Sequence, residues 1–175
     1  WEKISKMYED LPSSTEQVLH PEKYWKNRDN PIVITLPALP KEWSLLCHNL
    51  HVEYPIRIIL KELNGGTKKE IETAAAGWDG DRYAVYERDG LVSSLWYTTW
   101  DSKEDSKEFF QAYKKALQHK YKDYGGKGED NVDQVFHLSG PGNRGVLMHR
   151  QGTDVLVIDG DDAIQKHAAE ILKEV

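Results

Sequence analysis

The sequence predicts an α+β fold: a mainly antiparallel sheet built from two ββα units with helices packed on one face, preceded by a helical N-terminal segment. The first unit carries the strongest pattern. Residues 94–100 alternate bulky side chains between two faces, and Asp89-Gly90 supplies the turn that joins them to a strand at 82–87. The following helix has apolar residues at helical spacing, namely Phe109, Phe110, Tyr113, Ala116, Leu117 and Tyr121.

The same order of elements returns nearer the C-terminus. Strands are expected at 132–138, 145–150 and 154–159, and the last of them is an uninterrupted apolar run that is typical of a buried strand. Asp161 or Asp162 then caps a helix whose apolar positions are Ile164, His167, Ala168, Ile171, Leu172 and Val175. We interpret residues 78–122 and 132–175 as a possible internal ββα repeat, and we expect both units to share one sheet.

Residues 1–50 form a separate helical and extended segment in this interpretation, and residues 51–175 form the α+β domain. Apolar residues at helical spacing predict a first helix that ends at Pro12. Ser13 and Glu16 have the spacing of a capping box, which begins a second helix. Helical turns therefore dominate the start of the chain.

Three elements connect this segment to the first ββα unit. Residues 32–36 lie between two prolines and predict a short edge strand. An apolar stripe predicts a helix at 55–63 that ends at Asn64-Gly65-Gly66. Thr67 and Glu70 form a capping box that begins a further helix.

Acidic residues outnumber basic ones by 29 to 23, which gives the chain a formal net charge of −6 at pH 7. This charge argues against nucleic acid and against an anionic membrane surface as partners. No apolar run approaches the roughly 20 residues that cross a bilayer, so we expect no transmembrane segment. The chain opens at Trp1 without an initiator methionine, which indicates a piece of a longer protein.

Cysteine and histidine offer candidates for a nucleophile or a zinc site. Cys47 is the single cysteine; with His48 it could act as nucleophile and base, and with His51 it could bind a metal. Adjacent side chains seldom face each other, and no second Cys/His pair lies at zinc-site spacing. The HExxH motif of zinc peptidases is absent from the sequence. We therefore predict no catalytic residue, no metal ligand and no cofactor.

Aromatic and charged residues of the first ββα unit form a second candidate. Trp78, Trp96 and Trp100, together with Asp81 and Arg82, could line a groove for a small ligand. In the alternative, which the sequence favours, the tryptophans pack in the core beneath the helices. Asp81 and Arg82 would then brace the end of the preceding helix through local hydrogen bonds and a salt bridge.

Two stretches resemble a known family. They are similar to the C-terminal part of a family of bacterial and archaeal proteins, and they comprise residues 11–24 and residues 74–83 with 96–101. The first stretch contains the motif STEQ-LHPEKY, in which the dash stands for Val18. The N-terminal part of those proteins resembles gluzincin-type zinc metallopeptidases, and many of them are exported or lipid-anchored. The resemblance implies a downstream domain at the cell envelope whose partner is the upstream domain of the same polypeptide. The family pattern has Gly where this chain has Asp79, which argues against a metal role there.

The first function that follows is a non-catalytic accessory or interaction domain of a larger metallopeptidase-like protein. The N-terminal segment would be its docking piece, with Tyr8, Glu16, His20 and Tyr24 as interface residues. An exposed apolar patch within residues 1–25 would favour this function.

The alternative function is an independent small-ligand-binding or hydrolytic domain. Its groove would lie near Trp78, Asp81, Arg82 and Trp100. A polar pocket that contains an acid with a strongly shifted pKa would favour this function instead.

Overall fold

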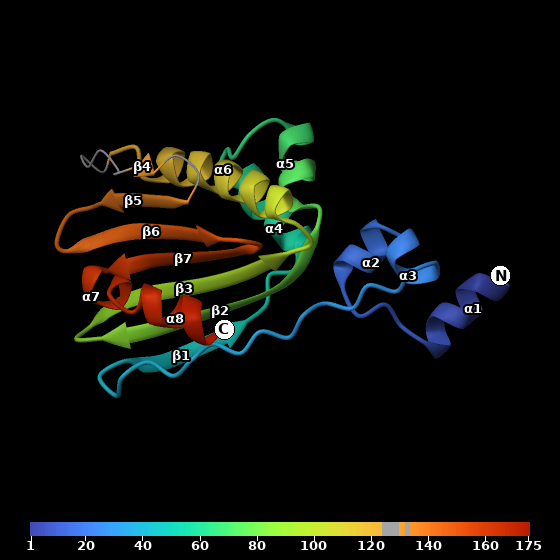
Figure 1. Cartoon of the computed structure of the whole chain (residues 1–175), viewed down its shortest axis with the longest axis horizontal. Coiled ribbons are helices and arrows are strands. Elements are labelled where there is room, and N and C mark those ends of the chain that lie inside the picture. The colour runs from blue at the N-terminus through green and yellow to red at the C-terminus, as the bar shows by residue number, and fades with distance from the viewer. Residues whose placement is uncertain (124–129, 132–133) are drawn as a thin grey trace.

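The computed structural model confirms an α+β fold with an antiparallel sheet and a helical N-terminal segment (Figure 1). It describes residues 1–123, 130–131 and 134–175. The helices in this part are α1 (Glu2–Glu9), α2 (Thr15–Leu19), α3 (Glu22–Trp25), α4 (Glu53–Glu62), α5 (Lys68–Ala75), α6 (Lys103–Lys120), α7 (Asp162–Gln165) and α8 (Ala168–Glu174). The strands are β1 (Ser44–Asn49), β2 (Trp78–Arg88), β3 (Leu91–Trp100), β4 (Asp130–Asn131), β5 (Val135–Ser139), β6 (Arg144–Gln151) and β7 (Asp154–Asp161).

The two ββα units share one sheet, as the sequence predicts. The strands lie in the order β1-β2-β3-β7-β6-β5-β4, and neighbouring strands are antiparallel. Residues 94–99 of β3 pair with residues 154–159 of β7, so the centre of the sheet is the junction of the two units. The β2–β3 turn is tight because Asp89 (φ 54°) and Gly90 (φ 78°) both adopt left-handed conformations.

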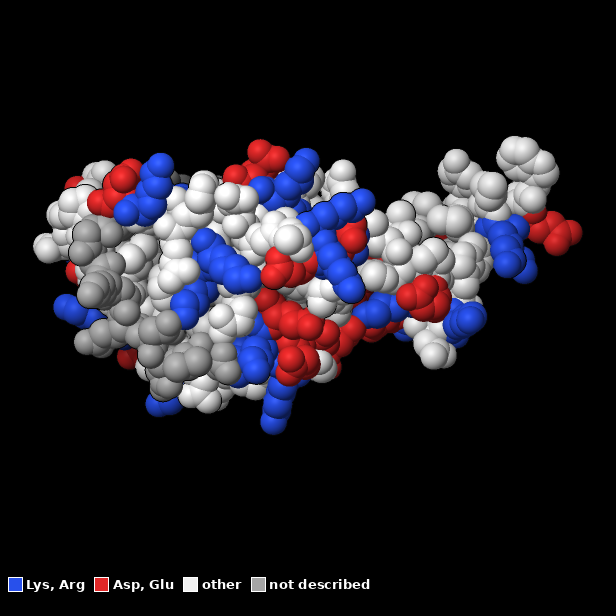
Figure 2. All heavy atoms as spheres, turned by 90° about the horizontal axis from the view of Figure 1, so that it is seen from above, with Lys and Arg blue, Asp and Glu red and all other residues white. Residues whose placement is uncertain are grey.

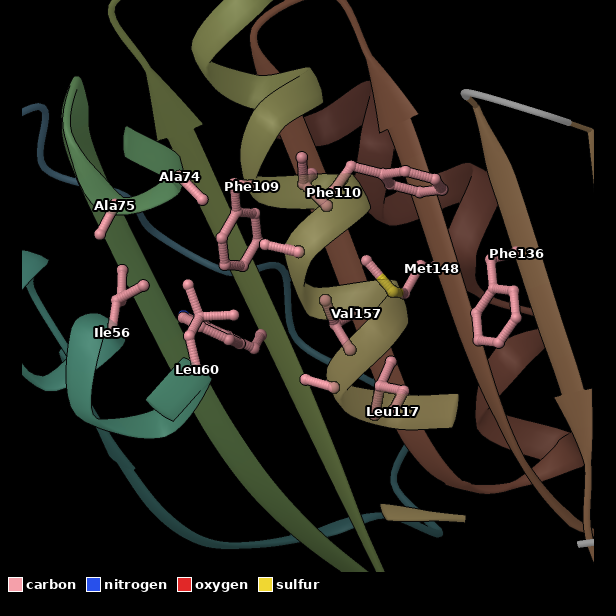
Figure 3. Packing of buried hydrophobic residues seen from close by; sticks show 14 of the residues in the cluster. Ile56, Leu60, Ala74, Ala75, Phe109, Phe110, Leu117, Phe136, Met148 and Val157 are labelled. Atoms are coloured by element: carbon pink, nitrogen blue, oxygen red, sulfur yellow. The ribbon is translucent and has the colours of Figure 1, made fainter. Parts of the chain in front are cut away.

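Helices α4, α5 and α6 cover one face of the sheet. Trp96 and Trp100 of β3 meet Phe109 of α6 there, with ring centroids 5.4 and 4.6 Å from that of Phe109. Each fully buried side chain of this size contributes about 1.5–3 kcal/mol relative to exposure. The cluster on this face includes Ile56, Leu60, Ala74, Ala75, Phe109, Phe110, Leu117, Phe136, Met148 and Val157 (Figure 3).

The opposite face is covered by α7, α8 and the extended residues 31–43, so the expectation that the helices pack on one face is wrong. Ile164 and Ile171 of these helices pack in one cluster with Ile158 of β7. The reason lies in β7, where the consecutive apolar residues 155–158 alternate between the two faces and are all buried. A central strand of this kind needs an apolar cover on both sides.

The edge strand of the sheet is β1 at 44–49, and the strand expected at 32–36 does not form. Pro31 has no N–H to donate to a strand ladder. Ile32 does donate its N–H to the carbonyl oxygen of Asp79 at 2.6 Å, but residues 32–36 remain extended outside any strand. The sheet therefore begins within the first 50 residues, which the sequence analysis assigned to the N-terminal segment.

The C-terminal unit differs from expectation in two details. The strand expected at 132–138 is β5, and residues 132–133 lie outside the described part of the chain. The single C-terminal helix is instead two helices: α7 ends at Gln165, and α8 begins at Ala168.

Replacing Gly80 with alanine is expected to destabilise the fold. A Cβ at this position would lie 2.4 Å from the backbone oxygen of Ile32, where residues 31–34 cross β2. Because backbone must move to relieve the clash, we expect a loss of about 1–3 kcal/mol in the free energy of unfolding, measured by urea denaturation. Gly152→Ala is the control, since nothing lies near its Cβ position and only its left-handed φ of 64° opposes a side chain. A G80A variant as stable as wild type would contradict the crossing.

Candidate functional site

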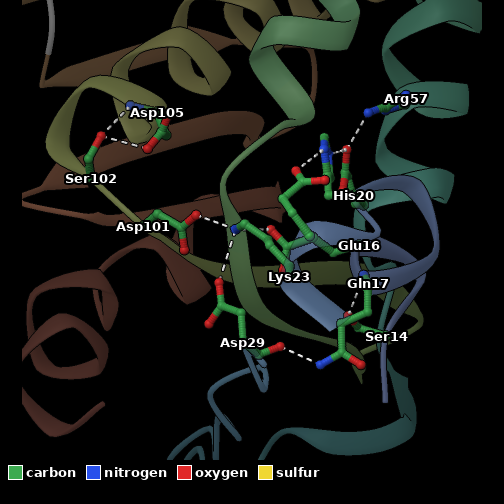
Figure 4. A network of polar contacts seen from close by, with 12 residues as sticks. Ser14, Glu16, Gln17, His20, Lys23, Asp29, Arg57, Asp101, Ser102 and Asp105 are labelled. Atoms are coloured by element: carbon green, nitrogen blue, oxygen red, sulfur yellow. Dashed lines mark hydrogen bonds and ion pairs between the residues drawn. The ribbon is translucent and has the colours of Figure 1, made fainter. Parts of the chain in front are cut away.

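The N-terminal segment meets the sheet at three carboxylates that surround one ammonium group (Figure 4). Lys23 of α3 lies between Glu16 of α2, Asp29 in the following coil and Asp101 directly after β3. Its Nζ is 2.7 Å from Glu16 Oε1 and 3.0 Å from Asp29 Oδ2, and it donates to Asp101 Oδ2 as well. One side chain thus joins the N-terminal segment to the start of α6.

Negative charge exceeds positive charge at this cluster. Burial raises the pKa of Glu16 to about 7, and although Lys23 opposes the shift, Asp101 and Asp29 add to it. Burial, followed by the charges of Asp101 and Asp29, also raises the pKa of Asp79. Figure 2 shows acidic side chains gathered where the N-terminal segment joins the rest of the molecule. Glu16 therefore holds a proton in part of the molecules near neutral pH.

Lys23 remains the positive centre of this cluster. Burial lowers the pKa of its ammonium group, but hydrogen bonds with Asp101, Glu16 and Asp29 outweigh burial and raise it above its usual range. A charged hydrogen bond of this kind is about twice as strong as a neutral one. The cluster is thus held together by one cation.

A second contact docks α2 on the first turn of α4. His20 Nε2 lies 3.0 Å from Glu53 Oε1, and Arg57 on the next turn of α4 bonds the same oxygen. The Glu53 side chain is fully buried, so its charge needs these partners. The N–H of Tyr54 also donates to Thr15 Oγ1 at 3.2 Å. His20 was predicted as an interface residue, and its partner in the structure is Glu53 of the same chain.

The cap of α2 differs from the expected capping box. Ser14, and not Ser13, is the N-cap residue, and its Oγ accepts from the N–H of Gln17 at 3.3 Å. Glu16 does not turn back to the cap, because its carboxylate bonds Lys23. The Oε1 of Gln17 accepts instead from the N–H of Ser13 at 2.9 Å.

The remaining contacts of the STEQ-LHPEKY motif are also internal to the chain. The Nε2 of Gln17 donates to the backbone oxygen of Asp29. Tyr24 is buried and donates from its hydroxyl to the backbone oxygen of Asp10. Three of the residues predicted at a docking interface thus bind the N-terminal segment to itself and to the sheet domain, namely Glu16, His20 and Tyr24. Tyr8 alone of the four predicted interface residues faces outward, 80% exposed.

Asp81 forms the most saturated polar centre in the described part of the chain. Its carboxylate is 1% exposed and accepts from the N–H groups of His51 (2.8 Å) and Val52 (3.0 Å) and from the indoles of Trp78 (3.2 Å) and Trp96 (3.0 Å). Val52 has a φ of 56°, which costs a β-branched residue on the order of 1–3 kcal/mol. The bonds from His51 and Val52 hold the backbone in this conformation at the entry to α4.

Asp81 and Arg82 do not brace the end of α5, so that expectation is wrong. Asp81 fixes the start of α4, as described above. The Nε of Arg82 donates to the backbone oxygen of Ile34 at 3.3 Å, and its guanidinium lies 3.4 Å from His48 Nδ1. Arg82 thus secures the extended segment that covers the second face of the sheet.

The predicted tryptophan groove is mostly core. Trp78, Trp96 and Trp100 are all buried, and the indole of Trp100 donates to Thr98 Oγ1 at 2.8 Å. A cavity of about 150 Å³ lies beneath residues 31–34, and its walls include Trp78, Asp81 and Arg82. Trp96 and Trp100 pack under α6 instead. Both oxygens of Asp81 already accept two hydrogen bonds each, so this carboxylate has no free acceptor for proton transfer.

The Cys47, His48 and His51 side chains are not brought together as ligands. Cys47 is exposed on β1, whereas His48 lies against Arg82. His51 stacks on the ring of Tyr83 with centroids 4.3 Å apart, and burial lowers its pKa. Within residues 1–123, 130–131 and 134–175, one group of side chains has ligand atoms close enough together to hold a metal ion, namely Glu16, Asp29 and Asp101. The ammonium group of Lys23 already bonds all three carboxylates.

Comparison with known proteins places this architecture in a family. The model of the family described as "Domain of unknown function (DUF8575)" matches residues 46–170, from β1 into α8. The chain belongs to the DUF8575 family. No curated protein and no solved structure matches the chain. None of the helices in the described part of this DUF8575 protein combines the length and the apolar character needed to cross a membrane.

Replacing Asp81 with asparagine is expected to destabilise the domain by about 3 kcal/mol or more. The asparagine amide keeps one acceptor oxygen, while its NH₂ group faces N–H donors. The buried donors on that side therefore lose their acceptor, and each unpaired donor costs about 1–3 kcal/mol of stability. Urea denaturation followed by tryptophan fluorescence measures the loss. Asp79→Asn on the same strand is the control, because it removes a carboxylate whose charged form is already disfavoured by burial and by the nearby acids. Equal stability of D81N and D79N would contradict the assigned role.

The stability of the chain is expected to fall as pH rises through 7, because of Glu16. The pKa of Glu16 is about 7 in the folded chain against an ordinary value of 4.5, so the folded state binds more protons than the unfolded state between these pH values. Glu16→Gln keeps an oxygen for Lys23 and should remove up to about 3 kcal/mol of pH dependence. Urea denaturation at a series of pH values measures the slope. Asp29→Asn, at a half-exposed partner of the same lysine, should retain most of the slope, because burial of Glu16 raises its pKa more than Asp29 does. An E16Q slope equal to that of wild type would contradict the assignment.

Proposed function

We propose that this chain is a non-catalytic accessory or interaction domain that binds its partner through the apolar face of α1. No residue of α1 is buried. The large apolar side chains exposed at helical spacing along this helix and its end are Trp1, Ile4, Tyr8 and Leu11. An apolar stripe of this kind on an otherwise polar helix marks a surface that another surface covers.

The attachment of α1 supports this proposal. The helix projects away from the sheet (Figure 1). Its C-terminal end is fixed, because Arg28 bonds the Asp10 side chain and donates to the backbone oxygen of Leu11 at 2.8 Å, while Tyr24 donates to the backbone oxygen of Asp10. The guanidinium of Arg28 also lies 5.1 Å from the ring centroid of Tyr24. The chain thus holds the helix in place and leaves its apolar face open, which lowers the entropy cost of binding.

The proposed partner is the upstream domain of the same polypeptide, and we propose that this domain is metallopeptidase-like, as in the family that residues 11–24 resemble. The saturation of Asp81 and the separation of Cys47, His48 and His51 support a role without chemistry of its own. An exported or envelope-bound parent protein is part of the same proposal.

The alternative is a small-ligand site at the cavity beside Trp78, Asp81 and Arg82. The position of the cavity favours this site, since three of the four residues predicted for the groove lie in the walls of the cavity. Its size disfavours it, because about 150 Å³ is below the roughly 300–1,000 Å³ of ligand pockets. We therefore rank it second.

The test of the first function is the double substitution Ile4→Lys and Tyr8→Lys in the full-length polypeptide, with a protease site inserted before Trp1. After cleavage, the two parts of the wild type should co-purify, and those of the double variant should separate, because two charges enter an apolar contact. Val18→Lys, at an exposed position of α2, should leave the parts together. The urea midpoint of the double variant should equal that of wild type, since both side chains are exposed. Separation of the wild-type parts would overturn the proposal.

A further inference from the structure

The outer edge of β1 has no partner strand in the described part of the chain. β1 lies at the end of the strand order and pairs with β2 alone. All six of its residues are exposed, and none of them takes part in a backbone hydrogen bond outside the sheet ladder. An edge with unpaired N–H and C=O groups is a template on which another strand can pair.

The side chains of this edge lack the usual protection against pairing. Residues 44–50 contain no charged residue and no proline, in a chain whose charged residues amount to 30%. Leu45, Leu46 and Leu50 are 51%, 55% and 43% exposed. Folded proteins usually block an open edge with lysine, proline or a bulge, and the one such device here is a register shift between Leu45 and Cys47. The residues after the shift pair regularly with β2.

The apolar surface extends beyond the strand itself. Leu50 shares the wall of a cavity with Ile32 and Val33, which are also exposed. Exposed apolar side chains therefore lie on the strand and also next to its C-terminal end, where the extended segment passes Leu50. This surface is separate from the stripe on α1, and the inference below does not depend on the proposed function.

We propose that β1 pairs with β1 of a second copy of this chain, so that two sheets join edge to edge as one antiparallel sheet. Cys47 is the middle residue of the uncharged run, and we place the two-fold axis of the dimer at this residue. Cys47 then lies opposite Cys47 of the other copy, and residue 44 of each copy lies opposite residue 50 of the other. Full overlap of 44–50 with itself therefore occurs in this register. Two copies that each carry a net charge of −6 meet here without a like-charged pair, which favours self-pairing at this edge over others.

The opposite edge of the sheet does not offer the same contact. Within the described residues, β4 consists of Asp130 and Asn131, so this strand presents little backbone to pair. A closed dimer, with one isologous interface, is therefore expected, in place of an open chain of sheets.

The register predicts the position of the cysteines. Directly opposed residues in antiparallel strands have Cα atoms about 4.5 or 5.5 Å apart, and both distances lie within the range of a disulfide. Oxidation by dissolved oxygen with copper-phenanthroline removes two electrons and two protons from two Cys47 thiols and forms one S–S bond. The exposed thiols thus report the proposed register.

The test is sedimentation equilibrium of the full chain from micromolar to hundreds of micromolar concentration. Wild type should be a dimer. Leu46→Lys with Leu50→Lys should weaken it by about tenfold or more in Kd, because residues 46 and 50 of one copy lie diagonally across the edge from residue 46 of the other, within reach of long like-charged side chains. The matched control is Val18→Lys with Ile58→Lys, which adds the same charge at exposed positions away from β1 and should leave Kd unchanged. Circular dichroism of each variant verifies the fold.

Four outcomes would overturn the proposal. The first is a wild type that stays monomeric throughout this range. The second is a dimer that L46K/L50K leaves intact and I4K/Y8K disrupts, since α1 would then be the interface. The third is a wild-type dimer whose Cys47 thiols form no disulfide within the dimer under oxidation, since the register centred on Cys47 would be wrong. Cys47→Ser should lose the disulfide and keep the dimer, and loss of both would also contradict the proposal.

Discussion

The buried carboxylate of Asp81 is the interaction on which the rest of the sheet domain depends. Its four donors come from both strands of the first hairpin and from the backbone that enters α4. They hold the backbone of Val52 in a left-handed conformation, and α4 then packs on the tryptophans that supply two of the donors. A charge without water needs all of these bonds, so the hairpin, the turn and the helix stand in one fixed arrangement.

A second ionic centre, Lys23, fixes the N-terminal segment to the sheet domain, and its balance of charge differs from that of Asp81. Asp81 is matched by neutral donors, whereas Lys23 faces three carboxylates. The surplus of negative charge makes this junction sensitive to protons, and the junction carries the helix that we propose as the docking surface. The strength of this junction therefore depends on pH, whereas that of the Asp81 centre rests on neutral donors.

The elements that depend on local pattern were predictable. The first hairpin and α6 follow from alternation, a turn glycine and helical spacing, and the shared sheet follows from two units that each expose an apolar face. The covering of both faces of the sheet was not predictable. His167 and Ile171 lie at helical spacing, but this spacing does not reveal which face of the sheet their helix contacts. The donors of Asp81 and the ion pair between Lys23 and Asp101 were missed, because contacts between residues distant in sequence leave no local pattern. Nothing in the local sequence marks Lys23 as a buried centre, since Lys26 and Arg28 lie close to it.

The extended residues 31–43 have a consequence for the limits of the folding unit. The family match begins at residue 46, yet Ile34 and Trp43 pack in the cluster that contains Ala84, Tyr86 and Leu95. A polypeptide cut at the family boundary would expose this apolar face and lose the backbone bond between Ile32 and Asp79. The region that the family model matches is thus smaller than the unit that packs together in this chain, so a stable piece of this domain has to begin before residue 34.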